Sequence, residues 1–362
     1  MGFIISVSTL TGMFTKPLIG LLSDRWGRRS WLLIGTAFFV LMPFAYRFVG
    51  SPDQLVAVRI VHGMATAIYG PVTLAYVAEM SPAGRAERLA WFSIARNAGY
   101  IVGPLAAGWM LLTMDPVSVF TVIGLLSAAA FLPVLSLKES ATPQIARPPS
   151  LAVQAVRGLL SGGRTPAVWL AGGMESANYV ALYAVKAFLP LQALSLGMNA
   201  AAVGTFFAVQ ESFHVVLNPL GGRVGDRFGH RAAVSLGMGI MGVGLATLTF
   251  VNSFWVLMTP AVLLGVGQAL VFPSTVALVS DHVDRTNLGL GMGLVGTLRN
   301  AGKVAGPIAG GFLVAMLDFS ATFALTATAL VLAATSLGLA GWAARRARMA
   351  EEKAATYGVA SR

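Results

Sequence analysis

The sequence of 362 residues contains no cysteine. This absence excludes disulfide bonds, cysteine-ligated zinc, iron–sulfur clusters and thiol catalysis. Histidine is scarce as well, and its copies are too far apart in the sequence to form a local metal-binding motif. They are His62, His214, His230 and His282. We therefore expect neither a metal site nor another cofactor.

Charged residues are also few: they make up 11% of the chain, and hydrophobic residues make up 56%. A soluble domain carries about 25% charged residues, so this chain has too few charges to cover a soluble surface. The sequence predicts an integral membrane protein. Its net charge of +11 belongs to loops between apolar segments, and no soluble basic module of the nucleic-acid-binding type is visible. No nucleic-acid partner is expected.

Eleven segments have the roughly 20 mostly apolar residues that a helix needs to cross a bilayer. Backbone polar groups must be paired in lipid, and these segments are far longer than barrel strands. We therefore expect an all-α integral membrane protein with 11 spans. The first segment lacks the basic start and cleavage site of a signal peptide, so it is expected to span. The segments are residues 1–22, 31–49, 54–78, 88–112, 117–137, 166–193, 200–222, 232–250, 254–280, 288–315 and 320–342.

Basic residues predict the orientation of these spans. Of the 25 lysines and arginines, 18 fall on one side, and the loops of the other side hold only Arg47. Basic residues concentrate in cytoplasmic loops. We expect a multi-pass protein of the cell membrane with its C-terminus in the cytoplasm and Met1 outside.

Two segments recur at a fixed distance. Gly20–Arg29 (GLLSDRWGRR) returns 202 residues later as Gly222–Arg231 (GRVGDRFGHR), and Arg96–Gly99 (RNAG) returns 203 residues later as Arg299–Gly302. Such a repeat indicates two related halves.

The polar, proline-containing segment 138–165 separates the halves. We expect an N-terminal helix bundle over 1–137, a cytoplasmic linker over 138–165, a six-helix C-terminal bundle over 166–342 and a cytoplasmic tail over 343–362. The first half has five spans and the second has six, so the first helix of the first half is expected to be missing, through truncation or a downstream start.

The paired Gly-x3-Asp-Arg-x-Gly-x-Arg loops and the two-half layout resemble the major facilitator superfamily over the whole chain. The resemblance implies a secondary transporter that moves a small solute by alternating access. It also implies that the loop forms a conformational latch, in which Asp24 faces the start of the span 288–315 and Arg28 pairs with Glu79. His230 replaces Arg28 in the second copy, where the ion pair is not expected. The alternative is that the arginines only set the topology. The implied latch residues are Gly20, Asp24, Arg25, Gly27, Arg28, Glu79, Asp226 and Arg227.

A second motif resembles the antiporter motif of the same family, which implies export. It consists of Gly99, Gly103, Pro104 and Gly108. Small residues permit close helix packing and proline removes a backbone donor, so generic packing is the alternative. Arg59 resembles a family position that handles protons or substrate, although it could instead extend its side chain to the membrane surface.

Charged residues inside spans are candidates for function because a charge at the bilayer centre costs about 2.5–3.5 kcal/mol. Glu211 is central and precedes His214 by three residues; we expect it to carry the proton, and a structural pair with His214 is the alternative. Glu175 and Lys186 share one helical stripe that is expected to face a cavity. The eight intramembrane charges are Lys16, Arg59, Arg96, Lys186, Arg299, Lys303, Glu175 and Glu211.

The leading interpretation is a monomeric, proton-coupled exporter of a small molecule in the lipid bilayer. An uptake symporter for a sugar or organic anion is the first alternative, because six bases against two acids suit an anion. A truncated, non-transporting membrane protein is the second. No nucleophile–base constellation or phosphate-binding loop is visible, so no enzyme is expected.

Overall fold

In the computed structural model, residues 1–80, 84–139, 165–283 and 288–360 are described, and this part of the chain is helical throughout its spans. The N-terminal half contains α1 (Gly2–Trp26), α2 (Arg28–Ala45), α3 (Pro52–Glu79), α4 (Arg85–Met110), α5 (Pro116–Ala128) and α6 (Phe131–Ser136). The C-terminal half contains α8 (Pro166–Ser195), α9 (Ala200–Phe228), α10 (His230–Thr247), α11 (Phe254–His282), α12 (Leu288–Met316) and α13 (Phe319–Ala360). Short 3-10 turns, η1 (Tyr46–Phe48) and η2 (Leu248–Phe250), extend α2 and α10.

The eleven predicted spans and the all-helical class are confirmed, with α5 and α6 together forming the fifth span. By length and hydropathy, seven of the spans in the described residues qualify as membrane helices on their own. The other four are α1, α4, α8 and α12. These four helices hold six of the eight intramembrane charges, which suggests that they face other helices or water more than lipid.

The helix ends differ between the two ends of the molecule. We call the end where segment 138–165 joins the halves the linker end, and the other the far end. At the far end, side chains cap the helix starts: Ser51, Asp115, Asn199 and Asp318 accept hydrogen bonds from backbone N–H groups of α3, α5, α9 and α13. Such caps satisfy backbone donors that the helix itself cannot pair.

At the linker end, α2 and α10 instead follow Gly27 and Gly229, whose φ angles are +89° and +94°. Glycine reaches this region of backbone space without steric cost. Each of these glycines turns the chain sharply between two antiparallel spans, and their equivalence repeats the sequence offset of 202 residues.

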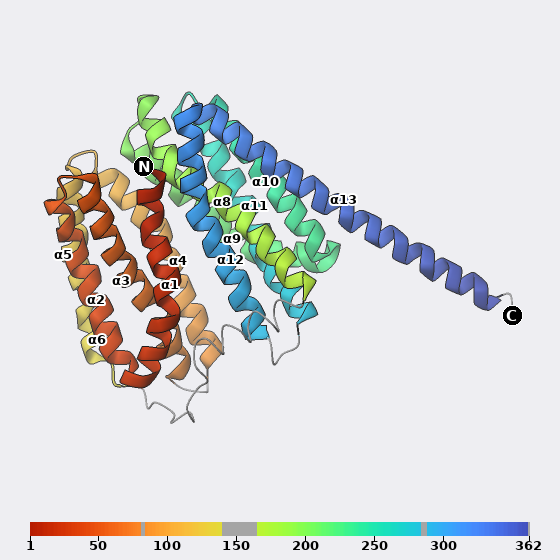
Figure 1. The fold of residues 1–362 in the computed structure, drawn as a ribbon, viewed down its shortest axis with the longest axis horizontal. Coiled ribbons are helices and arrows are strands. Elements are labelled where there is room, and N and C mark those ends of the chain that lie inside the picture. The colour runs from red at the N-terminus through yellow and green to blue at the C-terminus, as the bar shows by residue number, and fades with distance from the viewer. Residues whose placement is uncertain (81–83, 140–164, 284–287, 361–362) are drawn as a thin grey trace.

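The halves touch through α1 with α12 and through α4 with α9. Glycines allow the helices to approach: a Cβ on Gly2 would lie 1.8 Å from the Pro307 carbonyl oxygen, and one on Gly204 would lie 2.3 Å from that of Pro104. The Ser6 hydroxyl donates to the Val304 carbonyl across the same seam, at 2.7 Å. All of these contacts lie toward the far end, and Figure 1 shows the halves diverging toward the linker end.

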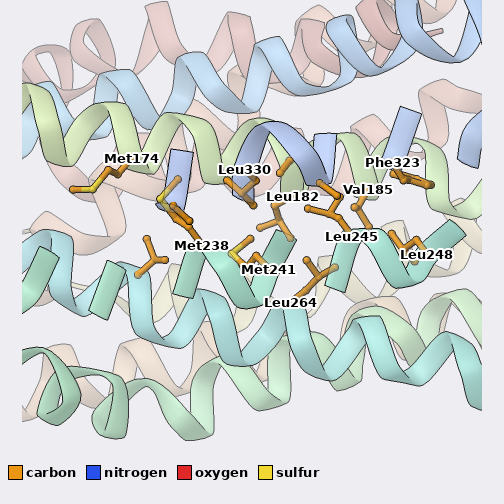
Figure 2. Packing of buried hydrophobic residues seen from close by; sticks show 14 of the residues in the cluster. Met174, Leu182, Val185, Met238, Met241, Leu245, Leu248, Leu264, Phe323 and Leu330 are labelled. Atoms are coloured by element: carbon orange, nitrogen blue, oxygen red, sulfur yellow. The ribbon is translucent and has the colours of Figure 1, made fainter. Parts of the chain in front are cut away.

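The C-terminal half has the larger buried core. Side chains of α8, α10, α11 and α13 converge in it, including Leu182, Met241, Leu264 and Phe323, as Figure 2 shows. The N-terminal half has a smaller buried cluster around Ile68 and Val72. Among the described residues, the C-terminal half is therefore the more extensively packed of the two.

The last predicted span, residues 320–342, matches the membrane-spanning part of α13, Phe319–Ala343. The helix itself continues to Ala360, so residues 343–360 of the expected tail are helical (Figure 1). Residues 343–360 contain seven alanines and no proline, and only one glycine, a composition that favours helix.

Candidate functional site

Glu175 of α8 is buried, with 1% of its side chain exposed, and it pairs with Arg299 of α12. The distance between Arg299 Nε and Glu175 Oε2 is 3.0 Å. The hydroxyl of Thr275, on α11, donates to the other carboxylate oxygen. This ion pair ties three helices of one half together. Glu175 therefore lies inside the packing of the C-terminal half, whereas Lys186 of the same predicted stripe is exposed. That the stripe faces a central cavity stays a prediction.

Asn178 and Leu182, on the same predicted stripe, are buried as well. Neither amide atom of Asn178 has a hydrogen-bond partner in the described residues. It lines a small cavity with Glu175, Tyr179 and Gln268. Buried polar atoms of this kind are usually satisfied by ordered water.

A group of cations and tyrosines lies next to the Glu175–Arg299 ion pair. Lys303 of α12 sits over the rings of Tyr179 and Tyr183, at 4.8 and 5.6 Å from their centroids. Lys186 sits 5.3 Å from the Tyr183 centroid. Arg299 lies 5.7 Å from the Tyr179 ring. Ring faces attract cations, so the tyrosines hold these charges in place. Sequence reasoning missed Tyr183, although it follows Tyr179 by four residues and so lies on the same helical face.

Glu211 and His214 of α9 contact each other. Their spacing predicted such a structural pair as the alternative to a role for Glu211 in carrying the proton. His214 Nδ1 lies 3.1 Å from Glu211 Oε1, and the two side chains are 16% and 12% exposed. Glu211 also interacts electrostatically with Lys186 of α8. Lys186 has accessible surface although protein surrounds it, as expected of a group that lines a water-filled space.

Three lysines of the central region have no acid partner. Lys16 of α1, Lys186 of α8 and Lys303 of α12 form no ion pair with a carboxylate in the part of the chain that the structure describes. At Lys303, the repulsion from Arg299 and the other two lysines opposes the attraction of Glu175. Positive charge therefore gathers where α1, α8 and α12 face one another.

Arg59 is not part of this group. It lies in the N-terminal half and interacts electrostatically with Tyr46 and His62. The Tyr46 hydroxyl and His62 Nδ1 are 3.0 Å apart, and Tyr46 stacks on Phe120. Arg59 Nε is buried without a hydrogen-bond partner among the described residues.

The first copy of the latch loop holds the ion pair that the family resemblance implies. Arg28 donates to both carboxylate oxygens of Glu79, at 2.7 and 3.2 Å, and to the Ser23 hydroxyl at 2.8 Å. A Cβ at Gly20 would meet open space. The side chains of Asp24 and Arg25 lie outside the described residues, as do residues 284–287, so the contact expected for Asp24 does too.

The second copy also holds a pair, contrary to expectation. His230 Nε2 lies 3.4 Å from Asp281 Oδ2. Asp281 stands 202 residues after Glu79, which is the offset of the loop itself. The sequence repeat could therefore have predicted Asp281 as the partner of His230. In the same loop, Asp226 and Arg227 are exposed, and Arg227 lies over the Phe228 ring at 5.4 Å.

The antiporter-like motif divides into two parts. Pro104 and Gly108 form the seam with α9: a Cβ on Gly108 would lie 2.6 Å from the Ala200 carbonyl oxygen. Gly99 and Gly103, by contrast, face open space. Only the far-end part of the motif therefore makes the close helix contact.

Among the described residues, no group of three or more histidine, aspartate or glutamate side chains could hold a metal ion. Ionisable groups of the central region instead come in pairs and in a lysine cluster. Such a region can bind a charged solute and exchange protons.

Comparison with known proteins agrees with this architecture. The Major Facilitator Superfamily matches residues 1–174 and 168–356. The class G tetracycline resistance protein of Vibrio anguillarum is 29% identical, over 91% of this chain and 81% of that protein. The multidrug resistance protein MdtG of Proteus mirabilis is 25% identical, over 90% of this chain and 82% of that protein.

A solved structure shares the fold. The nucleoside transporter NupG superposes with a TM-score of 0.76 at 15% identity, covering 93% of this chain and 90% of that one. The family match extends over both halves and the helical architecture agrees with it. The chain belongs to the Major Facilitator Superfamily, and it is a multi-pass membrane protein and secondary transporter, not an enzyme.

Proposed function

We propose that the protein exports a small solute from the cytoplasm in exchange for protons. The observation that best supports this proposal is the pair of Glu211 and His214, which is partly exposed and lies beside Lys186. An acid at the meeting point of two rocking halves can take up a proton from one side and release it to the other. The proton and the solute then compete for one site, and that competition couples their opposite movements.

The shape of the molecule suits a cytoplasm-facing state. Its halves are closed at the far end through the Ser6–Val304 hydrogen bond and the Gly204–Pro104 contact. The basic loops at the linker end support a cytoplasmic position for that end. In this state a cytoplasmic solute reaches the central cations, and rocking of the halves about the seam exposes it outside.

The direction of transport rests on two supports. The α4 motif, with Pro104 and Gly108 at the seam, resembles that of exporters. Relatives named for tetracycline and multidrug resistance match over most of the chain. We expect one chain to work as a monomer, since each half contributes one side of the site.

Everted membrane vesicles with an acid interior test the proposal. A panel of candidate solutes is added while a dye reports the internal pH. We expect an exported solute to make the interior more alkaline, because each solute that enters releases protons. Glu211→Gln keeps the shape of the side chain but cannot titrate, so this signal should disappear. Solute exchange without a pH gradient should persist.

Glu87→Gln is the matched control, since Glu87 is an exposed acid at the linker-end start of α4. It should leave the proton signal unchanged. If Glu211→Gln retains full pH-driven transport, Glu211 is not the proton carrier. If no solute moves protons in either direction, the proposed coupling is wrong.

A second candidate is co-transport of protons with an organic anion. The three lysines without acid partners favour it. A proton on Glu211 would make the site more positive and strengthen anion binding, so both would move in the same direction. In the same vesicles, an added anion would then acidify the interior, which is the opposite sign to export by exchange.

A further inference from the structure

A polar pocket opens at the linker end of the C-terminal half, far from the central lysines in the fold. It lies between the start of α10, the end of α11 and the middle of α13, and it contains about 1090 Å³ of empty space including its mouth. Its polar lining includes His230, Arg231, Asp281 and His282, with Trp342 at the rim. The transport proposal uses none of these groups.

The pocket offers donors to an anion. Arg231 is exposed, and no side chain caps the start of α10, whose N-terminal N–H groups carry partial positive charge. The His282 Nδ1–H donates to the Leu278 carbonyl at 2.9 Å, which fixes the ring at the edge of the pocket. Asp281 is the opposing charge, and His230 pairs with it.

A separate apolar groove lies farther along the same two helices, α10 and α13. Its lining alternates between α10 and α13: Ser235, Leu236, Gly239, Ile240 and Val243 on one side and Val331, Ala334 and Thr335 on the other, with Leu263 of α11. The two helices touch at its floor, where the Ser235 hydroxyl donates to the Ala334 carbonyl at 2.7 Å. A side chain at Gly239 would meet open space.

The polar pocket and the apolar groove share helical faces. Arg231, Ser235, Gly239 and Val243 follow one another at intervals of four residues along α10. At 1.5 Å per residue, this stripe is about 18 Å long, close to the roughly 15 Å of half a bilayer core. Trp342 at the rim is typical of the level where lipid headgroups begin, and Arg346 lies over its ring at 5.1 Å.

We propose that an anionic phospholipid binds here, with its phosphate in the pocket at Arg231 and the α10 start and one acyl chain along the α10–α13 groove. The positive charge of the pocket favours an anionic headgroup. The apolar groove favours a ligand that carries an acyl chain over a free phosphate ion. The site touches the His230–Asp281 pair of the second latch loop, so a bound lipid would brace that loop. It is separate from the central site and does not depend on the direction or coupling of transport.

Native mass spectrometry of the full chain, released from nanodiscs of phosphatidylcholine and phosphatidylglycerol, tests this inference. We expect one retained phosphatidylglycerol in preference to phosphatidylcholine. Arg231→Gln should weaken retention about fivefold, since one basic residue near an anionic headgroup contributes about 1 kcal/mol. Gly239→Leu should weaken retention of both lipids by filling the groove.

Two controls match these variants. Arg223→Gln removes an exposed charge from the last turns of α9 without touching the pocket, and Ala305→Leu fills a different apolar groove, between α1 and α12. Both should retain the lipid as the wild type does. Equal retention of the two lipids, displacement by inorganic phosphate alone, or no effect of either test variant would each overturn the proposal. If Arg231→Gln does not fold, the proposal is tested by Gly239→Leu and by the retention of phosphatidylglycerol compared with phosphatidylcholine in the wild type.

Discussion

The two intramembrane acids of the C-terminal half, Glu175 and Glu211, differ in how far they are closed off from solvent. Glu175 is closed off from solvent, with a cation and a hydroxyl on its two oxygens. Glu211 keeps some exposure and has a titratable partner. This difference in packing, rather than residue type, supports our proposal that Glu211 and not Glu175 carries the proton.

This division leads to a stability prediction. Glu175→Gln leaves Arg299 without its counter-charge in a site where Arg299 is only 21% exposed. Breaking a buried pair by removing one partner costs about 3–5 kcal/mol. We expect a clear fall in the thermal unfolding temperature of the purified protein.

The double variant Glu175→Gln with Arg299→Gln separates the pair from other effects. Because it leaves no uncompensated charge, it should regain part of the lost stability. A single variant as stable as the wild type would show that the pair does not hold α8 to α12.

Sequence reasoning was limited at this scale by distance along the chain. The Glu211–His214 contact is local, and helical periodicity predicts it. Glu175 and Arg299 are 124 residues apart, and nothing in either local sequence indicates the partner. Burial of Glu175 was also missed, because a stripe of polar residues on a helix has the same pattern whether it faces a cavity or pairs within a core.

At the scale of helices, the internal repeat predicts more than the motifs alone. Equivalent glycines follow α1 and α9, and equivalent acids, Glu79 and Asp281, lie against Arg28 and His230 of the two loops. The His230–Asp281 contact was missed because the second loop has histidine where the first has Arg28. The offset of 202 residues, applied to Glu79, would have indicated Asp281 as the partner. Hydropathy predicts the end of the last span at residue 342, close to Ala343, but it does not predict that the helix continues to Ala360.

The α4–α9 seam gives a prediction for helix packing. A Cβ on Gly204 would lie 2.3 Å from a carbonyl oxygen of α4, closer than real contacts allow. Gly204→Val should therefore force α4 and α9 apart and open the far end. The chain has no cysteine, so a single Ser6→Cys reporter at the α1–α12 seam can measure this opening. Ser6 is 2% exposed, and its labelling by a thiol reagent should be slow until Gly204→Val is added.

Gly103→Val is the matched control for this variant. Gly103 belongs to the same motif on α4, but a Cβ there meets nothing within 4 Å. It should leave the labelling of the reporter unchanged. Equal labelling in all three proteins would mean that the α4–α9 contact does not close the far end.

For the whole molecule, the two-half layout and the eleven spans could be predicted because hydropathy and repeats are long-range averages over many residues. The state of the transporter could not, because it depends on which ends of the same helices touch. Small residues occur along the whole of α4 and α12. Only the packing shows that Pro104 and Gly108 are engaged whereas Gly99 and Gly103 are open.

The last prediction concerns the exposure of the central region to one side of the membrane. Tyr100 of α4 is 56% exposed and interacts electrostatically with Tyr183 of α8, so it faces the space between the halves. With the far end closed, a Tyr100→Cys reporter should react with a membrane-impermeant thiol reagent from the linker side only. In the orientation that we propose from the basic loops, that side is cytoplasmic, so everted vesicles should label quickly and right-side-out vesicles slowly.

Ser6→Cys is the reciprocal reporter, because it is shielded when the far end is closed. Two alternating states cannot expose both ends together, so any condition that speeds labelling at Ser6→Cys should slow it at Tyr100→Cys. Fast labelling of Tyr100→Cys in right-side-out vesicles would reverse the predicted orientation. Labelling of both reporters rising together would instead indicate an open channel or partial unfolding, because a carrier that rocks about one central site must close one end before the other opens.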